Sequence, residues 1–186
     1  MKKLLAILLV CLMLIPSFAG CTADKETRDI SSEVLSSDNS VKLNTPAKTQ
    51  EVTSYPIEKA FVRNGKDWAH LNWREIISKR AINQNNAEPL VIKNAGSDFT
   101  RYIYFTFDIS NFDSIMYKNV FFKPMFTDIN GQGFAYDVYE VDSSWNTDTI
   151  TWNTQPQRGA LLADGCVAGA FTNVDLTEAV DKAIQN

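Results

Sequence analysis

The sequence has little of what builds covalent or metal-held scaffolds. Among 186 residues there are three cysteines and one histidine, a poor supply for a disulfide-stapled scaffold, a Cys/His zinc site or a histidine-based triad. It also lacks an excess of basic side chains, because 22 acidic residues oppose 18 basic ones and leave a net charge of −4. A chain this close to neutrality carries no electrostatic footprint for nucleic acid. We therefore expect no metal, no cofactor and no nucleic-acid partner.

No apolar run reaches the length of about 20 residues that a membrane-spanning helix needs. The longest run extends from Leu4 to Ile15, and Lys2 and Lys3 precede it. A short apolar run behind two positive charges is typical of an export signal.

The residues after this run resemble a bacterial lipoprotein box. They read Phe18-Ala-Gly-Cys21, with phenylalanine where the box usually has leucine. In such proteins the signal is cleaved before the cysteine, whose thiol and amine are acylated. The resemblance implies a signal peptide over 1–20 and a diacylglyceryl Cys21 that carries palmitate-type chains and anchors the protein to the extracytoplasmic face of the cell membrane. Ser17-Phe-Ala19 also fits a small-x-small cleavage site, which would release a soluble protein that begins at Gly20.

Lipoprotein processing would also decide the state of the cysteines. It would remove Cys11 and acylate Cys21, so Cys166 would remain alone and could form no internal disulfide. We then expect Cys166 to be a small buried apolar residue.

Composition divides the remainder into two parts. Residues 22–56 hold eleven Ser or Thr and ten charged residues, whereas 19 of the 21 aromatic residues come after residue 56. The first part cannot bury enough apolar surface to offset the entropy lost on ordering, so we predict a flexible, disordered tether over 21–56. The single folded domain is predicted over 57–186.

Period-two patterns dominate this domain. Arg101 to Asp108 alternates an apolar row with a more polar one, as a half-buried strand does. An Asn-Gly hairpin signal lies within 127–133, and Asp175-Leu-Thr-Glu178 resembles a capping box that opens a short helix. Short strands with no βαβ alternation predict an antiparallel β-sandwich. The other predicted strands cover 90–93, 120–126, 134–141, 149–152 and 171–174.

Several of these runs resemble the DNRLRE domain, also classed as carbohydrate-binding module family 96. They are Ala60-Phe-Val-Arg63, Leu90-Val-Ile-Lys93, Thr100-Arg through Asp108, Val138-Tyr-Glu-Val141 with Trp145, Thr149-Ile-Thr-Trp-Asn153 with Pro156, and Val174-Asp-Leu-Thr177. The resemblance implies an all-β, jelly-roll-like antiparallel β-sandwich with a short C-terminal helix. It also implies a non-catalytic module that binds a polysaccharide or cell-wall glycan, with a polysaccharide-degrading enzyme as a further partner.

One departure from the family pattern concerns the C-terminal strands. The sequence lacks the Asp-Asn-Arg-Leu-Arg-Glu-like run that names the family. Either the domain is truncated or this variant dispenses with those strands. We expect a missing strand to leave an exposed sheet edge.

Charge and aromatic residues indicate where a ligand would bind. Residues 57–101 carry eight basic and five acidic side chains, whereas residues 102–186 carry four basic and eleven acidic ones. Guanidinium and ammonium groups suit the carboxylates of acidic sugars, and indole rings can stack on sugar rings. The candidate carbohydrate-binding residues are Arg63, Lys93, Arg101, Trp68 and Trp73.

Two other functions stay open at this point. A sandwich of this kind could be a structural or protein-interaction module without a glycan ligand. The carboxylates Asp137, Glu140, Asp142 and Asp148 could supply the acid/base pair of a small polysaccharide-cleaving enzyme. With sixteen carboxylates in 57–186, such a pair arises easily by coincidence, and we expect no enzymatic activity and no catalytic residue.

Overall fold

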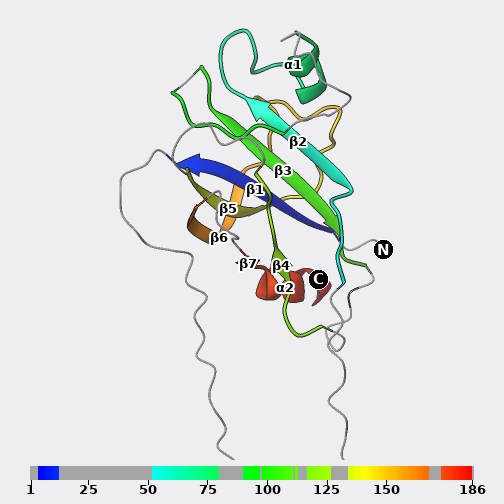
Figure 1. Cartoon of the computed structure of the whole chain (residues 1–186). Helices are drawn as coiled ribbons and strands as arrows, with labels where there is room; N and C mark the ends of the chain where they lie inside the picture. The colour runs from blue at the N-terminus through cyan, green and yellow to red at the C-terminus, as the bar shows by residue number, and fades with distance from the viewer. Residues whose placement is uncertain are drawn as a thin grey trace, which may run out of the picture.

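The computed structural model describes residues 4–12, 52–79, 90–96, 98–110, 112, 117–126, 134–167 and 173–185. Within them the chain is mostly antiparallel β-structure with two short helices, so the predicted all-β sandwich with a short C-terminal helix is confirmed (Figure 1). The elements are β1 (Leu4–Leu12), β2 (Glu58–Arg63), α1 (Trp73–Lys79), β3 (Arg101–Asp108), β4 (Phe121–Phe122), β5 (Ala135–Val141), β6 (Arg158–Val167), β7 (Val174–Asp175) and α2 (Thr177–Gln185).

A five-stranded sheet in the order β2-β3-β1-β5-β6 forms the main layer, and each neighbouring pair is antiparallel. The predicted strand Arg101–Asp108 is β3, with the predicted boundaries. Its alternation places Ile103 opposite Phe61 on one face and Tyr104 opposite Ala60 on the other. Both faces of the sheet are covered, since all four of these side chains are buried.

The centre of this sheet is the apolar run that resembles an export signal. β1 lies between β3 and β5 and pairs with both (Figure 1). Its side chains from Leu5 to Leu9 are at most 3% exposed, although they alternate between the two faces. A strand that is buried on both faces needs an unbroken apolar run rather than an alternating one. Burying five such side chains contributes on the order of 10 kcal/mol, which is comparable to the whole stability of a domain.

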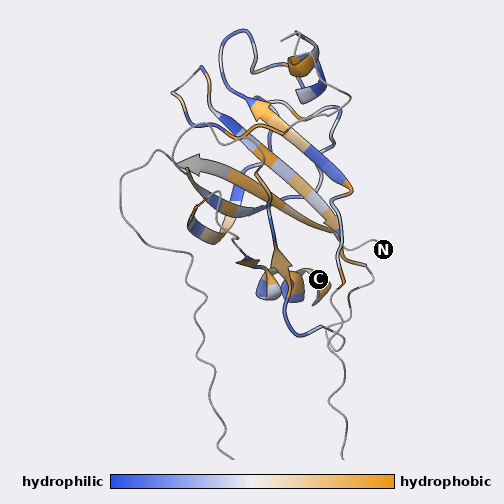
Figure 2. Cartoon of the chain, viewed as in Figure 1, coloured by the Kyte–Doolittle hydropathy of each residue, from blue (hydrophilic) through white to orange (hydrophobic). Residues whose placement is uncertain are grey.

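A small second layer covers one face of the main sheet. It consists of the two-stranded sheet β4-β7 and the helix α2 (Figure 1). The Phe122 ring lies 5.6 Å from Phe105 and 6.1 Å from Phe107, between ring centroids, and so joins the two sheets. Helix α2 begins as the capping residues predict, because Thr177 donates its backbone N–H to the Asp175 carboxylate over 2.9 Å. Ala179 and Val180 form its buried face, and its other residues include polar ones (Figure 2).

Residues 142–157 cover the opposite face. The Trp145 ring meets Tyr104 edge-on at 5.7 Å, and Trp152 lies tilted over Tyr102 at 4.8 Å. The Tyr104 hydroxyl donates to the Gln155 side-chain oxygen over 2.7 Å, and burial raises the pKa of this hydroxyl. The run that carries much of the family resemblance therefore closes the second face of the sheet.

Some predicted strands are shorter or absent. Residues 149–152 do not form a strand but connect two turns, and Ile150 closes the first turn by donating its backbone N–H to the Asn146 carbonyl over 2.9 Å. Residues 90–93 make a single bridge, from Lys93 to Arg101, and residues 120–126 form only β4. Strand β6 was not predicted, because its pattern is irregular and its first residues are exposed. The Asn-Gly hairpin over 127–133 lies outside the described residues, as do 171 and 172.

Cys166 corrects one expectation. It is fully buried, as expected, but it is disulfide-bonded, and its partner cysteine lies outside the described side chains. The expectation of a lone cysteine followed from lipoprotein processing, which would remove or acylate the two other cysteines of the chain. The chain in this structure still contains both.

Candidate functional site

Three cationic residues of the sequence prediction are backbone neighbours. Arg63 at the end of β2 stands opposite Arg101 at the start of β3. Lys93 pairs with Arg101 from the other side, through N–H to O=C distances of 2.7 and 3.2 Å. The topology thus gathers Arg63, Lys93 and Arg101 at one end of β2 and β3, although 38 positions separate the first from the last in the sequence.

Two aromatic rings lie among these cations. The Arg63 guanidinium carbon lies 3.7 Å from the centroid of the Trp68 ring and 5.5 Å from that of Phe99. The ammonium of Lys79 lies 5.0 Å from the Trp68 ring, and that of Lys93 lies 5.7 Å from the Phe99 ring. We call Arg63, Trp68, Lys79, Lys93, Phe99 and Arg101 the cation–aromatic patch.

A close contact between two loops holds the aromatic rings in place. Asn64 donates its backbone N–H to the Thr100 carbonyl over 2.9 Å. Gly65 follows with φ of +117°, and a Cβ there would lie 2.8 Å from the Asp98 carbonyl oxygen. Only glycine permits both this backbone conformation and this approach. The contact fixes the loop that carries Trp68 against the loop that carries Phe99, with Arg63 between them.

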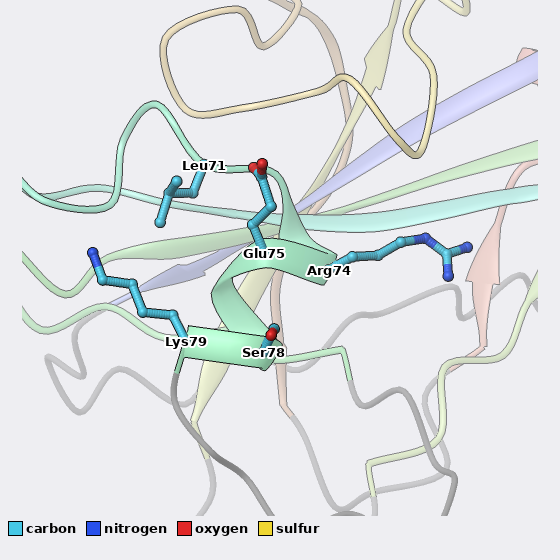
Figure 3. A pocket seen from close by; sticks show the side chains of 5 residues that line it. All are labelled: Leu71, Arg74, Glu75, Ser78 and Lys79. Carbon is cyan, nitrogen blue, oxygen red and sulfur yellow. The ribbon is translucent and has the colours of Figure 1, made fainter.

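Helix α1 supplies the fourth cation. Its first turn has a reciprocal cap, because Glu75 donates its N–H to the Asn72 side chain (3.0 Å) and Asn72 donates its N–H to the Glu75 carboxylate (2.8 Å). Arg74 and Lys79 extend from the helix in opposite directions (Figure 3). Arg74 is ion-paired with Asp148 at 2.9 Å. Lys79 donates to the neutral Asp67 carbonyl over 3.3 Å, which leaves its charge uncompensated by that bond.

A shallow hollow adjoins the patch along this helix. Figure 3 shows the side chains that line it, which are Leu71, Arg74, Glu75, Ser78 and Lys79. Lys79 belongs to both the hollow and the cation–aromatic patch.

Exposure separates the patch into a base and a rim. Arg63 and Arg101 are each 5% exposed, so they form the buried base. Lys79 and Lys93 are exposed, Phe99 is 49% exposed and Trp68 is half-buried. The rim is therefore the part of the patch that solvent reaches. The two arginines lie beneath it, and Arg63 contacts both rings from there.

Trp73 does not belong to this surface. Trp73 was predicted from the sequence to bind carbohydrate, but it opens helix α1 and its side chain is 0% exposed. Its ring meets Phe61 of β2 edge-on, with a centroid distance of 6.4 Å. The indole holds α1 on the sheet and is not available for stacking on a sugar from solvent.

Phe99 was not predicted from the sequence, and Lys79 was counted only among the eight basic residues of 57–101. Nothing in the local pattern around either residue indicates a site, since they join it through loop contacts. A second cluster was not predicted either, in which the exposed Arg158 lies over Tyr102 at 4.8 Å and over Tyr139 at 5.3 Å.

Three of the four carboxylates considered for acid/base chemistry, all but Glu140, have other contacts. Asp137 accepts hydrogen bonds from the Gly165 N–H (3.0 Å) and the Tyr139 hydroxyl (3.3 Å), and Asp148 pairs with Arg74. Asp142 accepts from Ser144, which lowers the pKa of the Asp142 carboxyl. Among the described residues, no three His, Cys, Asp or Glu side chains are grouped as a metal site requires.

Comparison with known families agrees with this architecture. A family model, carbohydrate-binding module family 96, matches residues 50–186. The match covers most of the chain, so the protein belongs to that family and is a carbohydrate-binding module. No curated protein matches the chain.

Proposed function

We propose that the cation–aromatic patch binds an acidic polysaccharide. The observation that carries this proposal is the succession of Lys79, Trp68, Arg63, Phe99 and Lys93 along one surface, in which each ring contacts two cations. A uronate unit has the two features that such a surface complements, namely an apolar sugar face for stacking and a carboxylate for the ammonium groups.

Calorimetry with matched oligosaccharides tests this proposal. We expect an oligouronate to bind and its neutral counterpart, with the same linkage but no carboxylates, to bind at least tenfold more weakly. The affinity for the oligouronate should fall steeply as salt rises from low to physiological ionic strength, because exposed charges are screened over about 8–10 Å. Equal affinity for both oligosaccharides at all salt concentrations would contradict the proposal.

We also propose that the module is presented at the extracytoplasmic face of a bacterial membrane through a lipid on Cys21. The support is the sequence Lys2-Lys3, the apolar run and the Ala-Gly-Cys box. Among the described residues, no helix is long and apolar enough to cross a membrane. Multiple acyl chains anchor far better than one, because each buried methylene contributes about 0.8 kcal/mol.

Metabolic labelling tests the anchor separately from the sugar site. Wild-type protein should incorporate labelled palmitate and sediment with membranes, whereas Cys21→Ser should do neither and should keep its N-terminal residues. A soluble wild-type protein that begins at Gly20 would contradict lipid anchoring without affecting the carbohydrate proposal.

A protein-interaction module is the second candidate, and the exposed apolar side chains Phe121 and Met125, 42% and 86% exposed, favour it. We propose that catalysis is absent, since three of the four candidate carboxylates, Asp137, Asp142 and Asp148, are engaged in other bonds and leave Glu140 without a second acid to pair with. An assay for reducing sugars or unsaturated uronates on the same oligosaccharides checks this, and turnover would overturn it.

A further inference from the structure

A second hollow lies where three segments that are far apart in the sequence meet. These are residues 55–59 at the start of β2, helix α1, and the turn that contains Thr147 and Asp148. The hollow is a cleft of about 510 Å³, a volume within the roughly 300–1,000 Å³ of small-ligand sites. None of the residues of the cation–aromatic patch lines it, so it is a separate surface, which we call the α1–β2 cleft.

Hydrogen bonds between the three segments fix the walls of the cleft. The Glu58 carboxylate accepts the Thr147 backbone N–H over 3.0 Å, and the Thr147 hydroxyl bonds to the same carboxylate, which joins β2 to the turn. Asn72 donates its side-chain amide to the Asp148 carbonyl over 3.0 Å and so joins the turn to the helix. Because the protein's own contacts form the walls, a ligand that enters the cleft meets a preorganised site.

Charge in the cleft is balanced, in contrast to the patch. The charged side chains that line it are Glu58 and Asp148 against Lys59 and Arg74. Arg74 is ion-paired with Asp148, from Nε to Oδ1, over 2.9 Å, and Arg74 extends away from Lys79 of the patch (Figure 3). A ligand carboxylate therefore meets no excess of positive charge here, and the cleft favours an uncharged ligand.

The polar groups of the cleft suit the hydroxyls of a sugar. The side chains of Arg74 and Asp148 are 53% and 68% exposed, so a ligand reaches both from solvent. A carboxylate accepts several hydrogen bonds, and a guanidinium carries five N–H donors. Each sugar hydroxyl both donates and accepts, so neighbouring hydroxyls of one ring match a carboxylate that lies beside a guanidinium.

Tyr55 adds an aromatic surface at the same place. It lines the cleft and is 79% exposed, and it is the only aromatic residue within 22–56. Two residues later, Ile57 anchors the chain by donating its backbone N–H to the Thr106 carbonyl over 2.8 Å. The chain thus presents an exposed ring beside hydrogen-bonding groups, and the apolar face of a pyranose stacks on such a ring.

We propose that the α1–β2 cleft is a second carbohydrate site, which binds an uncharged pyranose unit. Tyr55 stacks on the apolar face of the sugar ring, and Asp148 and Arg74 bond its hydroxyls. The inference goes beyond the proposed binding of acidic polysaccharide, because this site needs no carboxylate on the ligand and does not involve the cation–aromatic patch.

Nuclear magnetic resonance with ring-labelled tyrosine tests occupancy of the cleft. The full chain is titrated with three neutral probes, the β-1,4-linked hexaoses of glucose, mannose and galactose. We expect at least one of them to shift the Tyr55 ring signal, which is assigned by its loss in Tyr55→Phe. The affinity should be the same at low and physiological salt, because the ligand carries no charge to be screened. If no hexaose binds, or if one binds and leaves the Tyr55 signal unchanged, the proposal is wrong.

Substitutions at Tyr55 separate stacking from a structural role. Tyr55→Ala should weaken binding of that hexaose at least tenfold with an unchanged melting temperature, since the side chain is largely exposed. Tyr55→Phe keeps the ring and should lose little affinity. Phe121→Ala is the matched control, because it removes an exposed ring from β4, outside the cleft, and should bind like the wild type. Wild-type affinity in Tyr55→Ala would overturn the proposal.

A second pair of variants tests the hydrogen-bonding groups. Asp148→Ala should weaken hexaose binding at least fivefold, because it removes acceptors for the sugar hydroxyls. Glu178→Ala is the matched control, since it also breaks an exposed ion pair, with Lys182 on α2, and should leave the affinity unchanged. Equal affinities of these two variants would show that Asp148 does not bond the sugar and would contradict its assigned role.

The two carbohydrate sites are distinguishable by experiment. Lys79→Ala/Lys93→Ala should lose affinity for the oligouronate and keep its affinity for the hexaose, whereas Tyr55→Ala should do the reverse. Loss of hexaose binding in the lysine double variant would place the neutral sugar on the patch and overturn the second site. Failure of the oligouronate to bind the wild type would contradict the proposed function alone, because the hexaose titration does not involve the patch.

Discussion

Two clusters of this molecule place an arginine over aromatic rings, and they differ in what surrounds the arginine. Arg63 is buried between Trp68 and Phe99 and lies near three cations, Lys79, Lys93 and Arg101. The acidic residues Asp67 and Asp98 belong to the same two loops. Arg158 is exposed over Tyr102 and Tyr139, and the Tyr139 hydroxyl donates to Asp137. Burial and the charge of Asp137 raise the pKa of the Tyr139 hydroxyl.

The comparison teaches that stacking of a cation on a ring does not by itself make an anion site. Around Arg158, the carboxylate of Asp137 already supplies negative charge. Among the described residues around Arg63, the four cations of the patch stand against the two acidic residues of the adjoining loops, Asp67 and Asp98, so the excess of positive charge favours an added carboxylate. We therefore assign acidic-sugar binding to the Arg63 cluster rather than to the Arg158 cluster.

The largest effect we expect comes from the support beneath the Arg63 cluster. Trp73→Ala removes a fully buried indole that packs on Phe61, and should lower the free energy of unfolding by about 3–5 kcal/mol. Chemical denaturation measures this. A stable Trp73→Ala protein that has lost only sugar affinity would show instead that this indole contacts the ligand.

A smaller effect concerns the loop contact that positions the rings. Gly65→Ala puts a Cβ 2.8 Å from the Asp98 carbonyl oxygen at a φ of +117°, and should cost about 1–3 kcal/mol. It should also weaken oligouronate binding by displacing Trp68 from Phe99. Gly96→Ala is the control, because its φ is also positive (+77°) but a Cβ there meets nothing within 4 Å.

Arg63 and Arg158 should also differ in how much each stabilises the protein, with the buried Arg63 contributing more. Arg63→Ala removes a buried guanidinium from two rings and should destabilise the protein by about 2 kcal/mol, whereas Arg158→Ala should cost about 0.5–1 kcal/mol, as at exposed sites. Thermal unfolding of both variants checks this difference. Equal costs would show that burial of Arg63 adds nothing to its role.

The smallest effect lies outside both clusters, on α2. A hydrogen bond and ion pair with Lys182, at 2.7 Å, lower the pKa of the Glu178 carboxyl. A lowered pKa means that the pair stabilises the helix at neutral pH and that this contribution is lost as pH falls through the lowered pKa. Glu178→Gln should therefore flatten the acid side of the stability curve slightly and change nothing at the cation–aromatic patch. An unchanged acid limb would show that the exposed pair contributes nothing.

The fold could be predicted from the sequence more fully than the candidate site could. The alternation in Arg101–Asp108 and the cap at Asp175 are local signals, and both predicted the observed elements. The pattern of Leu4–Leu12 fits two roles equally well, because an export signal and a strand that is buried on both faces both need unbroken apolar residues. Local pattern could not choose between these roles.

The sequence predicted most of the cationic residues that belong to the candidate site, but it did not predict which of them are exposed to solvent. Charge counting indicated Arg63, Lys93 and Arg101, and the topology does bring them together. Counting could not show that both arginines are buried, since this depends on the covering loops. Phe99 and Lys79 reach the site through contacts that no spacing rule describes.

Calorimetric titration of one oligouronate into three proteins tests the central claim most directly. The proteins are the wild type, the double variant Lys79→Ala/Lys93→Ala, and Arg158→Ala as the control in the other cluster. We predict that the double variant binds at least tenfold more weakly with an unchanged melting temperature, because charge-assisted contacts contribute about 1.5–3 kcal/mol, and that Arg158→Ala binds like the wild type. An unaffected double variant, or a loss confined to Arg158→Ala, would contradict the account.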